Sequence, residues 1–172
     1  MRSGLILFMA SAAILLLEAG HGVAQTCLPK VRSTAPASRY IDHGDGTVTD
    51  TTTGLMWKQC AEGLEGAGCT SGQVVRLAWK EALSRPQENV FAGHNDWRLP
   101  TYKELSSLVE ERCYDPAINV ALFPSSPPAG FWSSTADANR MGYAWVVGFG
   151  YGDAFYGSES GPYFVRLVRD SK

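Results

Sequence analysis

The residues that could carry catalysis or bind a metal are few in this chain, and they are scattered. His43 lies in a turn and His94 beside one, and neither has a serine or cysteine partner at the spacing of a nucleophile motif. Asp42, Asp45 and Asp50 lie close together, but their spacing does not match an EF-hand loop, and aspartate is a common turn former. We therefore expect turns here, with no catalytic residue, no metal site and no cofactor.

The four cysteines indicate disulfide chemistry. The chain has no CxxC pair, which argues against a zinc site. An even number of cysteines behind a secretion signal, described below, predicts two disulfides, and four cysteines allow three pairings. Cys60 and Cys69 flank the glycine-rich loop 61–68, which their pairing would close. That pairing leaves Cys27 with Cys113.

Aromatic side chains gather in the last third of the chain and are candidates for ligand contacts. Sugars bind on aromatic faces beside a few hydrogen-bonding groups, and Tyr and Trp are large and rigid. Alternation along 143–149 puts its aromatic and apolar residues on one face of a strand, which we expect to be core. The ligand contacts that we expect are Asn139 and Arg140, in the loop 136–142, and Tyr151 and Asp153, at a hairpin tip.

One stretch, 95–105, is expected to organise the elements that position these residues. Thr101 and Glu104 form a capping box, and apolar residues follow at helical spacing, which predicts a helix over 102–112. Asp96 reads as a turn residue that pairs with Arg98. The structural hub that we expect consists of Asp96, Trp97, Arg98, Thr101 and Glu104.

The other elements are mostly strands. A hairpin is predicted over 40–49 and a strand over 55–58. A helix must end near Arg85 because Pro86 follows, while 73–77 could be either its start or an extended lead-in. Further strands are expected at 131–135, 143–149, 154–156 and 163–169. The last strand carries Arg166 and Arg169, for which a solvated or ion-paired face is favoured over polyanion binding. Helices and strands in separate runs indicate an α+β fold with two helices packed on antiparallel sheets.

The first residues are typical of a secretory signal. A basic start is followed by the apolar run 5–17 and by small residues, which predicts cleavage after Ala24. We expect a signal peptide at 1–24, an arm at 25–39 and one domain at 40–172, secreted or periplasmic and without a membrane span after processing. The net charge of −2 gives no general attraction to nucleic acid or to an anionic membrane.

Five ordered motifs then carry a family resemblance. They are Gly46-Thr47-Val48-Thr49-Asp50, Thr53-Gly54-Leu55-Met56-Trp57, Asp96-Trp97-Arg98-Leu99-Pro100-Thr101 with Glu104-Leu105, Trp132-Ser133-Ser134-Thr135 and Val165-Arg166-Leu167-Val168-Arg169. Over about 40–170 the chain resembles the C-terminal domain of a collagen-like adhesin, the Lcl C-terminal domain. The resemblance implies a C-type-lectin-like fold, export and adhesion. The named adhesin binds sulfated glycosaminoglycans and trimerises through a collagen stalk, but this chain has no Gly-X-Y tract and is acidic.

The functional expectation is an exported, noncatalytic binding module that recognises a carbohydrate or a surface protein through its loops. The alternative is a structural or assembly component of the cell envelope without a small ligand. The hub segment is also similar to the formylglycine-generating enzymes, which hold copper with a late cysteine pair. No cysteine follows Cys113, so that enzymatic alternative ranks last. The sequence leaves the oligomeric state open.

Overall fold

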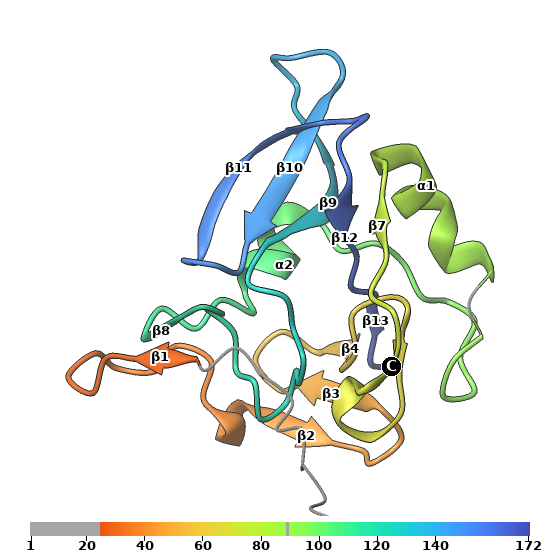
Figure 1. Cartoon of the computed structure of the whole chain (residues 1–172). Coiled ribbons are helices and arrows are strands. Elements are labelled where there is room, and N and C mark those ends of the chain that lie inside the picture. Colours follow the sequence, from red (N-terminus) through yellow and green to blue (C-terminus); the bar gives the residue numbers. More distant parts are fainter. Residues whose placement is uncertain (1–24, 89) are drawn as a thin grey trace, which may run out of the picture.

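The computed structural model describes residues 25–88 and 90–172, and the predicted signal peptide, 1–24, lies outside the described residues. Two sheets dominate (Figure 1). The larger has the order β11 (Asp153–Ser158), β10 (Tyr143–Gly148), β9 (Gly130–Ala136), β12 (Tyr163–Phe164), β7 (Arg76–Leu77). The smaller has the order β13 (Val168–Asp170), β4 (Leu55–Lys58), β3 (Thr47–Asp50), β2 (Tyr40–Asp42). Two short ribbons, β1 (Thr26–Cys27) with β8 (Cys113–Tyr114) and β5 (Leu64–Glu65) with β6 (Ser71–Gly72), complete the pairing.

The expected fold class is wrong in its main feature, the two helices packed on antiparallel sheets. The α-helices of the described residues are α1 (Trp79–Ser84) and α2 (Tyr102–Ser106), of 6 and 5 residues. Helices of under two turns cannot form a layer on a sheet. The structure is instead mostly β, and one of its strand pairs, β12 with β9, is parallel. Among the described residues, no helix has the length and apolarity that crossing a bilayer requires.

Helix α2 ends earlier than its apolar spacing predicts because its last turn meets competing hydrogen bonds. The Ser107 hydroxyl donates to the Glu104 carbonyl at 2.7 Å, a side-chain bond that competes with the helix ladder. The chain then leaves the helix to pair with a later segment, since the Glu110 amide donates to the Ala117 carbonyl at 3.1 Å. Tertiary pairing therefore overrides the local helical pattern of 107–112.

The region before α1 takes the extended alternative. Arg76 and Leu77 form β7 and pair with β12, so the helix begins only at Trp79. It ends at Ser84, and a 3-10 turn (Arg85–Glu88) contains Pro86. The predicted end of this helix near Arg85 is therefore confirmed.

The last predicted strand, 163–169, splits between the two sheets. Its first part, β12, lies between β9 and β7 in the larger sheet, whereas β13 pairs with β4 in the smaller one. The residues between them, 165–167, are all buried, because this stretch runs through the interior from one sheet to the other.

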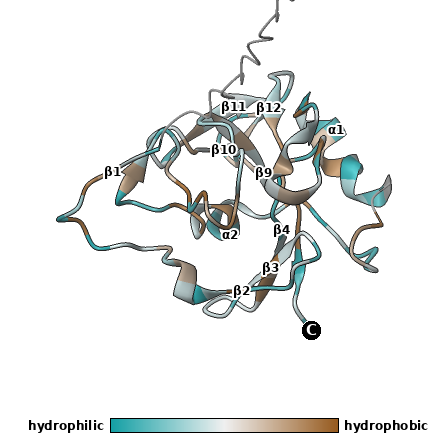
Figure 2. Cartoon of the chain, turned by 60° about the horizontal axis from the view of Figure 1, so that its bottom comes forward, coloured by the Kyte–Doolittle hydropathy of each residue, from teal (hydrophilic) through white to brown (hydrophobic). Residues whose placement is uncertain are grey.

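The core fills the space between and beside the sheets. One cluster of buried side chains centres on Trp57, Phe123 and Phe131, and a second on Trp97 and Trp132. Figure 2 shows hydrophobic and hydrophilic residues mixed along both the strands and the outer loops, with hydrophilic residues near the C-terminus. Both predicted disulfides are present: Cys27–Cys113 joins β1 to β8, and Cys60–Cys69 closes the glycine-rich loop.

Candidate functional site

The hub residues are held by one another. Arg98 donates to both carboxylate oxygens of Glu104, at 2.8 and 2.7 Å, and Glu104 also accepts the Thr101 amide at 2.7 Å in the predicted capping box. Burial alone would raise the pKa of the Glu104 carboxyl, but the bonds from Arg98 and Thr101 outweigh it and lower the pKa. Asp96 pairs with Arg169, at 2.7 and 3.1 Å, rather than with Arg98. The hub is therefore a clamp between α2 and β13, with its charges paired.

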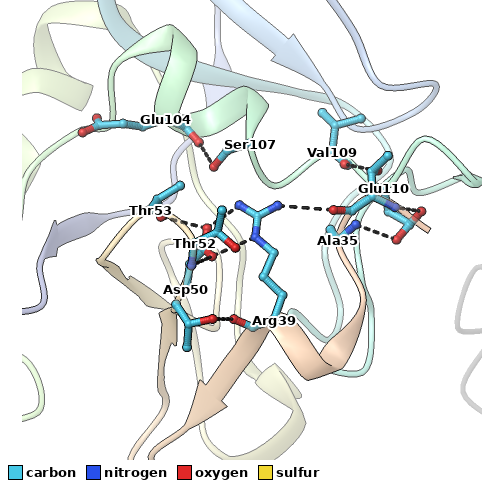
Figure 3. Close-up of polar contacts among 11 residues, drawn as sticks. Ala35, Arg39, Asp50, Thr52, Thr53, Glu104, Ser107, Val109 and Glu110 are labelled. Atoms are coloured by element: carbon cyan, nitrogen blue, oxygen red, sulfur yellow. Dashed lines mark hydrogen bonds and ion pairs between the residues drawn. The ribbon is translucent and has the colours of Figure 1, made fainter. Parts of the chain in front are cut away.

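A second polar cluster ties the N-terminal arm to the smaller sheet (Figure 3). The Arg39 guanidinium donates to both oxygens of Asp50, one at 2.7 Å, and to the Thr34 carbonyl. The buried Glu110 carboxylate accepts from the Ser33 hydroxyl and from the Thr34, Ala35 and Arg112 amides. Burial alone would raise the pKa of Glu110, but these donors lower it. This cluster fixes the arm and leaves its acceptors satisfied.

Arg166 is the most deeply placed charge among the described residues. It is fully buried, donates to the Lys58 carbonyl at 2.9 Å and the Ser126 hydroxyl at 2.7 Å, and lies over the rings of Phe123 and Phe131. Burial lowers the pKa of its guanidinium to about 9. Its contacts lock the segment that joins the two sheets, so it holds the fold and faces no ligand.

The histidines and the early aspartates make local contacts. The His43 ring nitrogen Nε2 lies 2.9 Å from the Thr49 hydroxyl, and the His94 ring lies 6.4 Å from that of Trp97. Asp42 accepts from the Gly44 amide at 2.9 Å, and Asp45 accepts from the Thr47 amide and hydroxyl. In the described part of the chain, no three His, Cys, Asp or Glu residues gather as metal ligands.

The four predicted ligand contacts do not meet in one place. Asn139 and Arg140 lie in the loop before β10, and Tyr151 and Asp153 lie at its other end. Strand β10 has 6 residues, so the two loops are about 20 Å apart. All four side chains are exposed. The structure thus places them on two separate surfaces, one at each end of β10.

The first surface is the tyrosine pair, Tyr114 and Tyr151. Tyr151 is 77% exposed, and its ring lies nearly parallel to that of Tyr114, with 6.3 Å between centroids and 19° between planes. The turn that presents it depends on Gly152, which has φ +79° and whose added Cβ would lie 2.6 Å from Val109. Asp115 adjoins the pair, since its amide donates to the Gly150 carbonyl at 2.8 Å.

The second surface is the aromatic ladder, Tyr102, Trp145, Tyr156 and Arg140. The Tyr102 and Trp145 rings stack at 4.7 Å and 28°, and Trp145 lies 4.3 Å from Tyr156, its cross-strand partner. The Arg140 guanidinium covers Tyr156 at 4.8 Å. Tyr143 adjoins the ladder on the same strand and is 39% exposed.

The expectation that the alternating face of 143–149 is core holds for only half of the strand. Val147 and Phe149 are buried, but Tyr143 is exposed and Trp145 is half-buried. The sequence analysis therefore missed Tyr102, Trp145 and Tyr156 as surface residues, and Tyr114 as the partner of Tyr151. The Tyr and Trp residues close to the loop 136–142 were the available signal for exposed rings. A buried Tyr or Trp needs a polar partner for its hydroxyl or indole N–H, which a position near a surface loop avoids.

A broad cleft of about 1050 Å³ lies between the turn 42–46 and the loop 60–69. Charged groups of its lining bind one another, with Lys58 2.6 Å and Arg85 3.1 Å from the Glu62 carboxylate. This charged cluster stabilises the wall of the cleft. The tyrosine pair remains the stronger candidate for binding, because the ring of Tyr151 is 77% exposed.

One family model matches the chain: the Lcl C-terminal domain, over residues 46–169. The matched range contains the hub, Arg166 and both ends of β10. No curated protein matches the chain.

Proposed function

Because the chain belongs to the family of Lcl C-terminal domains, we propose that it is an exported, noncatalytic adhesion module that recognises carbohydrate at the tyrosine pair. The two disulfides support export, since disulfides form and persist in oxidising compartments, either outside the cell or in the periplasm. The paired charges of the hub support a scaffold role for the family motifs, which leaves binding to the exposed loops.

The observation that carries the proposal is the open face of Tyr151. Tyr114 backs one side of the ring, and the 77% exposure of Tyr151 leaves a flat apolar surface in solvent. The C–H face of a pyranose packs on such a ring, and the rigid backing lowers the ordering cost of binding.

The polar groups beside the pair suit sugar hydroxyls. Asp115 is half-buried next to the Tyr151 turn, and Asp153 is exposed where β11 begins, two residues after Tyr151. Carboxylates only accept hydrogen bonds when ionised, and sugar hydroxyls donate. Their negative charge favours neutral or cationic sugars over sulfated ones.

A glycan array on the mature chain, 25–172, tests this function. We expect specific binding that is lost in Tyr151→Ala and weakened in Asp153→Asn, with an unchanged melting temperature because both side chains are exposed. Tyr156→Ala, at the other end of β10, is the matched control and should bind glycans like the wild type. Binding to no glycan, or equal binding by Tyr151→Ala, would contradict the proposal and favour an assembly role in the envelope.

A further inference from the structure

Strand β11 forms one edge of the larger sheet. Figure 1 shows it on the outer side of β10. Its 6 residues pair with β10 in one unbroken register, from Gly148↔Asp153 to Tyr143↔Ser158. Among the described residues, β10 is the only strand that pairs with it. The main-chain groups on the other side of β11 are therefore open to a further strand.

The register shows which main-chain groups of β11 face outward. Residues of an antiparallel ladder alternate between pairs that exchange main-chain hydrogen bonds and pairs that exchange none. The Glu159 amide donates to the Gly142 carbonyl at 2.8 Å, so the odd-numbered residues, Phe155 among them, bond to β10. The amides and carbonyls of Ala154 and Tyr156 therefore face away from β10, and no described residue bonds to them.

The other edges of the two sheets are occupied or short. Arg98 covers the outer side of β13, because its amide donates to the Val168 carbonyl at 2.8 Å and its carbonyl accepts the Val168 amide at 3.0 Å. β7 has 2 residues, and β2 has 3, one of which is the charged Asp42. Charges, prolines, bulges and short strands usually protect a sheet edge from pairing. Strand β11 has none of these from Ala154 to Ser158.

We propose that β11 pairs with the β11 of a second copy of this chain, antiparallel and about a two-fold axis at Phe155. This register places Ala154 of each copy opposite Tyr156 of the other. Each outward amide then meets an outward carbonyl of the partner copy, so both groups of both residues are bonded. Such an interface is the same patch on both copies, and it joins the two larger sheets into one.

The composition of β11 favours its own copy as the occupant. Directly opposed residues lie on the same face of a sheet, so the large Tyr156 lies opposite the small, exposed Ala154. At the axis, Phe155 of one copy lies opposite Phe155 of the other, which is an aromatic cross-strand pair. The charge of the strand, Asp153, lies opposite Gly157, so no like charges meet.

The open stretch of β11 is limited at both ends, which argues against a longer strand from another protein. The Ser158 carbonyl already accepts the Gly161 amide at 2.7 Å. At the other end, the Gly152 amide donates to the Gly148 carbonyl at 2.8 Å in the turn that precedes the strand. A longer segment would find few further groups to bond, whereas a second β11 has the same length and the same ends.

Analytical ultracentrifugation of the mature chain, from about 10 µM to about 1 mM, tests the proposal. Because the paired stretch is short, we expect a weak dimer, with a dissociation constant of roughly 0.1 to 1 mM. Ala154→Pro removes an outward amide hydrogen and should abolish the dimer at an unchanged melting temperature, since edge strands tolerate such a proline. Met141→Ala removes a 99% exposed side chain outside β11 and should dimerise like the wild type. Tyr151→Ala should also dimerise normally, which separates this result from glycan binding.

Two charge variants of the exposed Ala154 test the register. The Arg140 guanidinium lies 4.8 Å from the centre of the Tyr156 ring, so the proposed pairing brings it close to residue 154 of the other copy. Ala154→Glu should therefore tighten the dimer and Ala154→Lys should weaken it, each by roughly fivefold, the effect of cross-strand charge pairs. An equal effect of the two variants would overturn the register about Phe155.

Amide hydrogen exchange of the wild type tests the edge without any variant. In dilute protein, the amides of Ala154 and Tyr156 should exchange fast and those of Phe155 and Gly157 slowly. The two fast amides should become protected as the protein concentration rises.

Three results would overturn the proposal. They are a chain that stays monomeric at about 1 mM, a variant Ala154→Pro that dimerises like the wild type, and outward amides that stay unprotected where the dimer forms. A monomeric chain that binds an unrelated extended peptide at this edge would show that a foreign strand is the occupant, which also overturns pairing between copies.

Discussion

The hub and the polar cluster around Arg39, Asp50 and Glu110 (the arm cluster) differ from the two ends of β10 in how their polar groups are paired. In the hub and the arm cluster, each charge meets an opposite charge or main-chain donors, as in Arg98–Glu104 and Arg39–Asp50. At the ends of β10, the rings of Tyr143, Tyr151 and Tyr156 are exposed. The comparison indicates that the hub and the arm cluster maintain the scaffold, which leaves the exposed rings for the recognition that we propose.

Loss of the disulfide between β1 and β8 should give the largest effect. The Cys27–Cys113 bond spans 86 residues, so Cys27→Ser/Cys113→Ser should lower the free energy of unfolding by about 4.5 kcal/mol, through the entropy of the unfolded chain. Cys60→Ser/Cys69→Ser, which spans 9 residues, should lower it by about 2.5 kcal/mol. Urea unfolding measures both.

The same pair of variants tests whether the scaffold positions the tyrosine pair. Cys113 precedes Tyr114, so loss of the Cys27–Cys113 bond should weaken glycan binding at this end of β10. A larger stability loss from the short loop than from the long one would contradict the entropic account.

Glu110 should give the next largest effect. Replacement by Gln removes a carboxylate that accepts four donors and should cost about 2 kcal/mol at pH 7. Because folding lowers the pKa of Glu110, its stabilisation is present above the ordinary pKa of about 4.3 and is lost as the pH falls through the folded value.

The wild type should therefore lose stability below about pH 4.3 more steeply than Glu110→Gln does. Urea midpoints measured at intervals from pH 7 to pH 3 give both slopes. Parallel slopes would mean that Glu110 contributes nothing to acid sensitivity, and that the remaining carboxylates with lowered pKa, Asp45, Asp50, Asp96 and Glu104, account for it.

Thr101→Ala should give the smallest of these effects. It removes the hydroxyl that accepts the Glu104 amide at 3.3 Å, and the lost cap should cost about 1 kcal/mol. Glycan preference should not change, because the Arg98–Glu104 pair still holds the start of α2. Altered preference at unchanged melting temperature would show that the hub takes part in recognition.

Local features of the sequence predicted most of the strands correctly. The turn around His43–Gly46 sets the hairpin of β2 and β3, and the Thr101–Glu104 box sets the start of α2. The disulfide pairing followed from loop closure. Turns and helix caps are formed by residues that are close together in the sequence, so they can be recognised from the sequence alone.

Pairing between segments far apart in the sequence determined the features that local sequence patterns did not predict. The amide of Glu110 binds the Ala117 carbonyl and ends the helical pattern early, and Arg166 turns one expected strand into two. The exposure of Trp145 depends on what covers its face of β10, which alternation alone does not reveal. The partners of Tyr151 and Asp96 also lie in segments distant in the sequence, so they could not be assigned from spacing.

The crossing of the final segment from the larger sheet into the smaller one sets the order in which the molecule can assemble. β12 lies inside its sheet and β13 closes the other, so neither sheet is complete until residues 163–170 are in place. Because residues 163–170 contribute a strand to each sheet, neither sheet can close fully without the other.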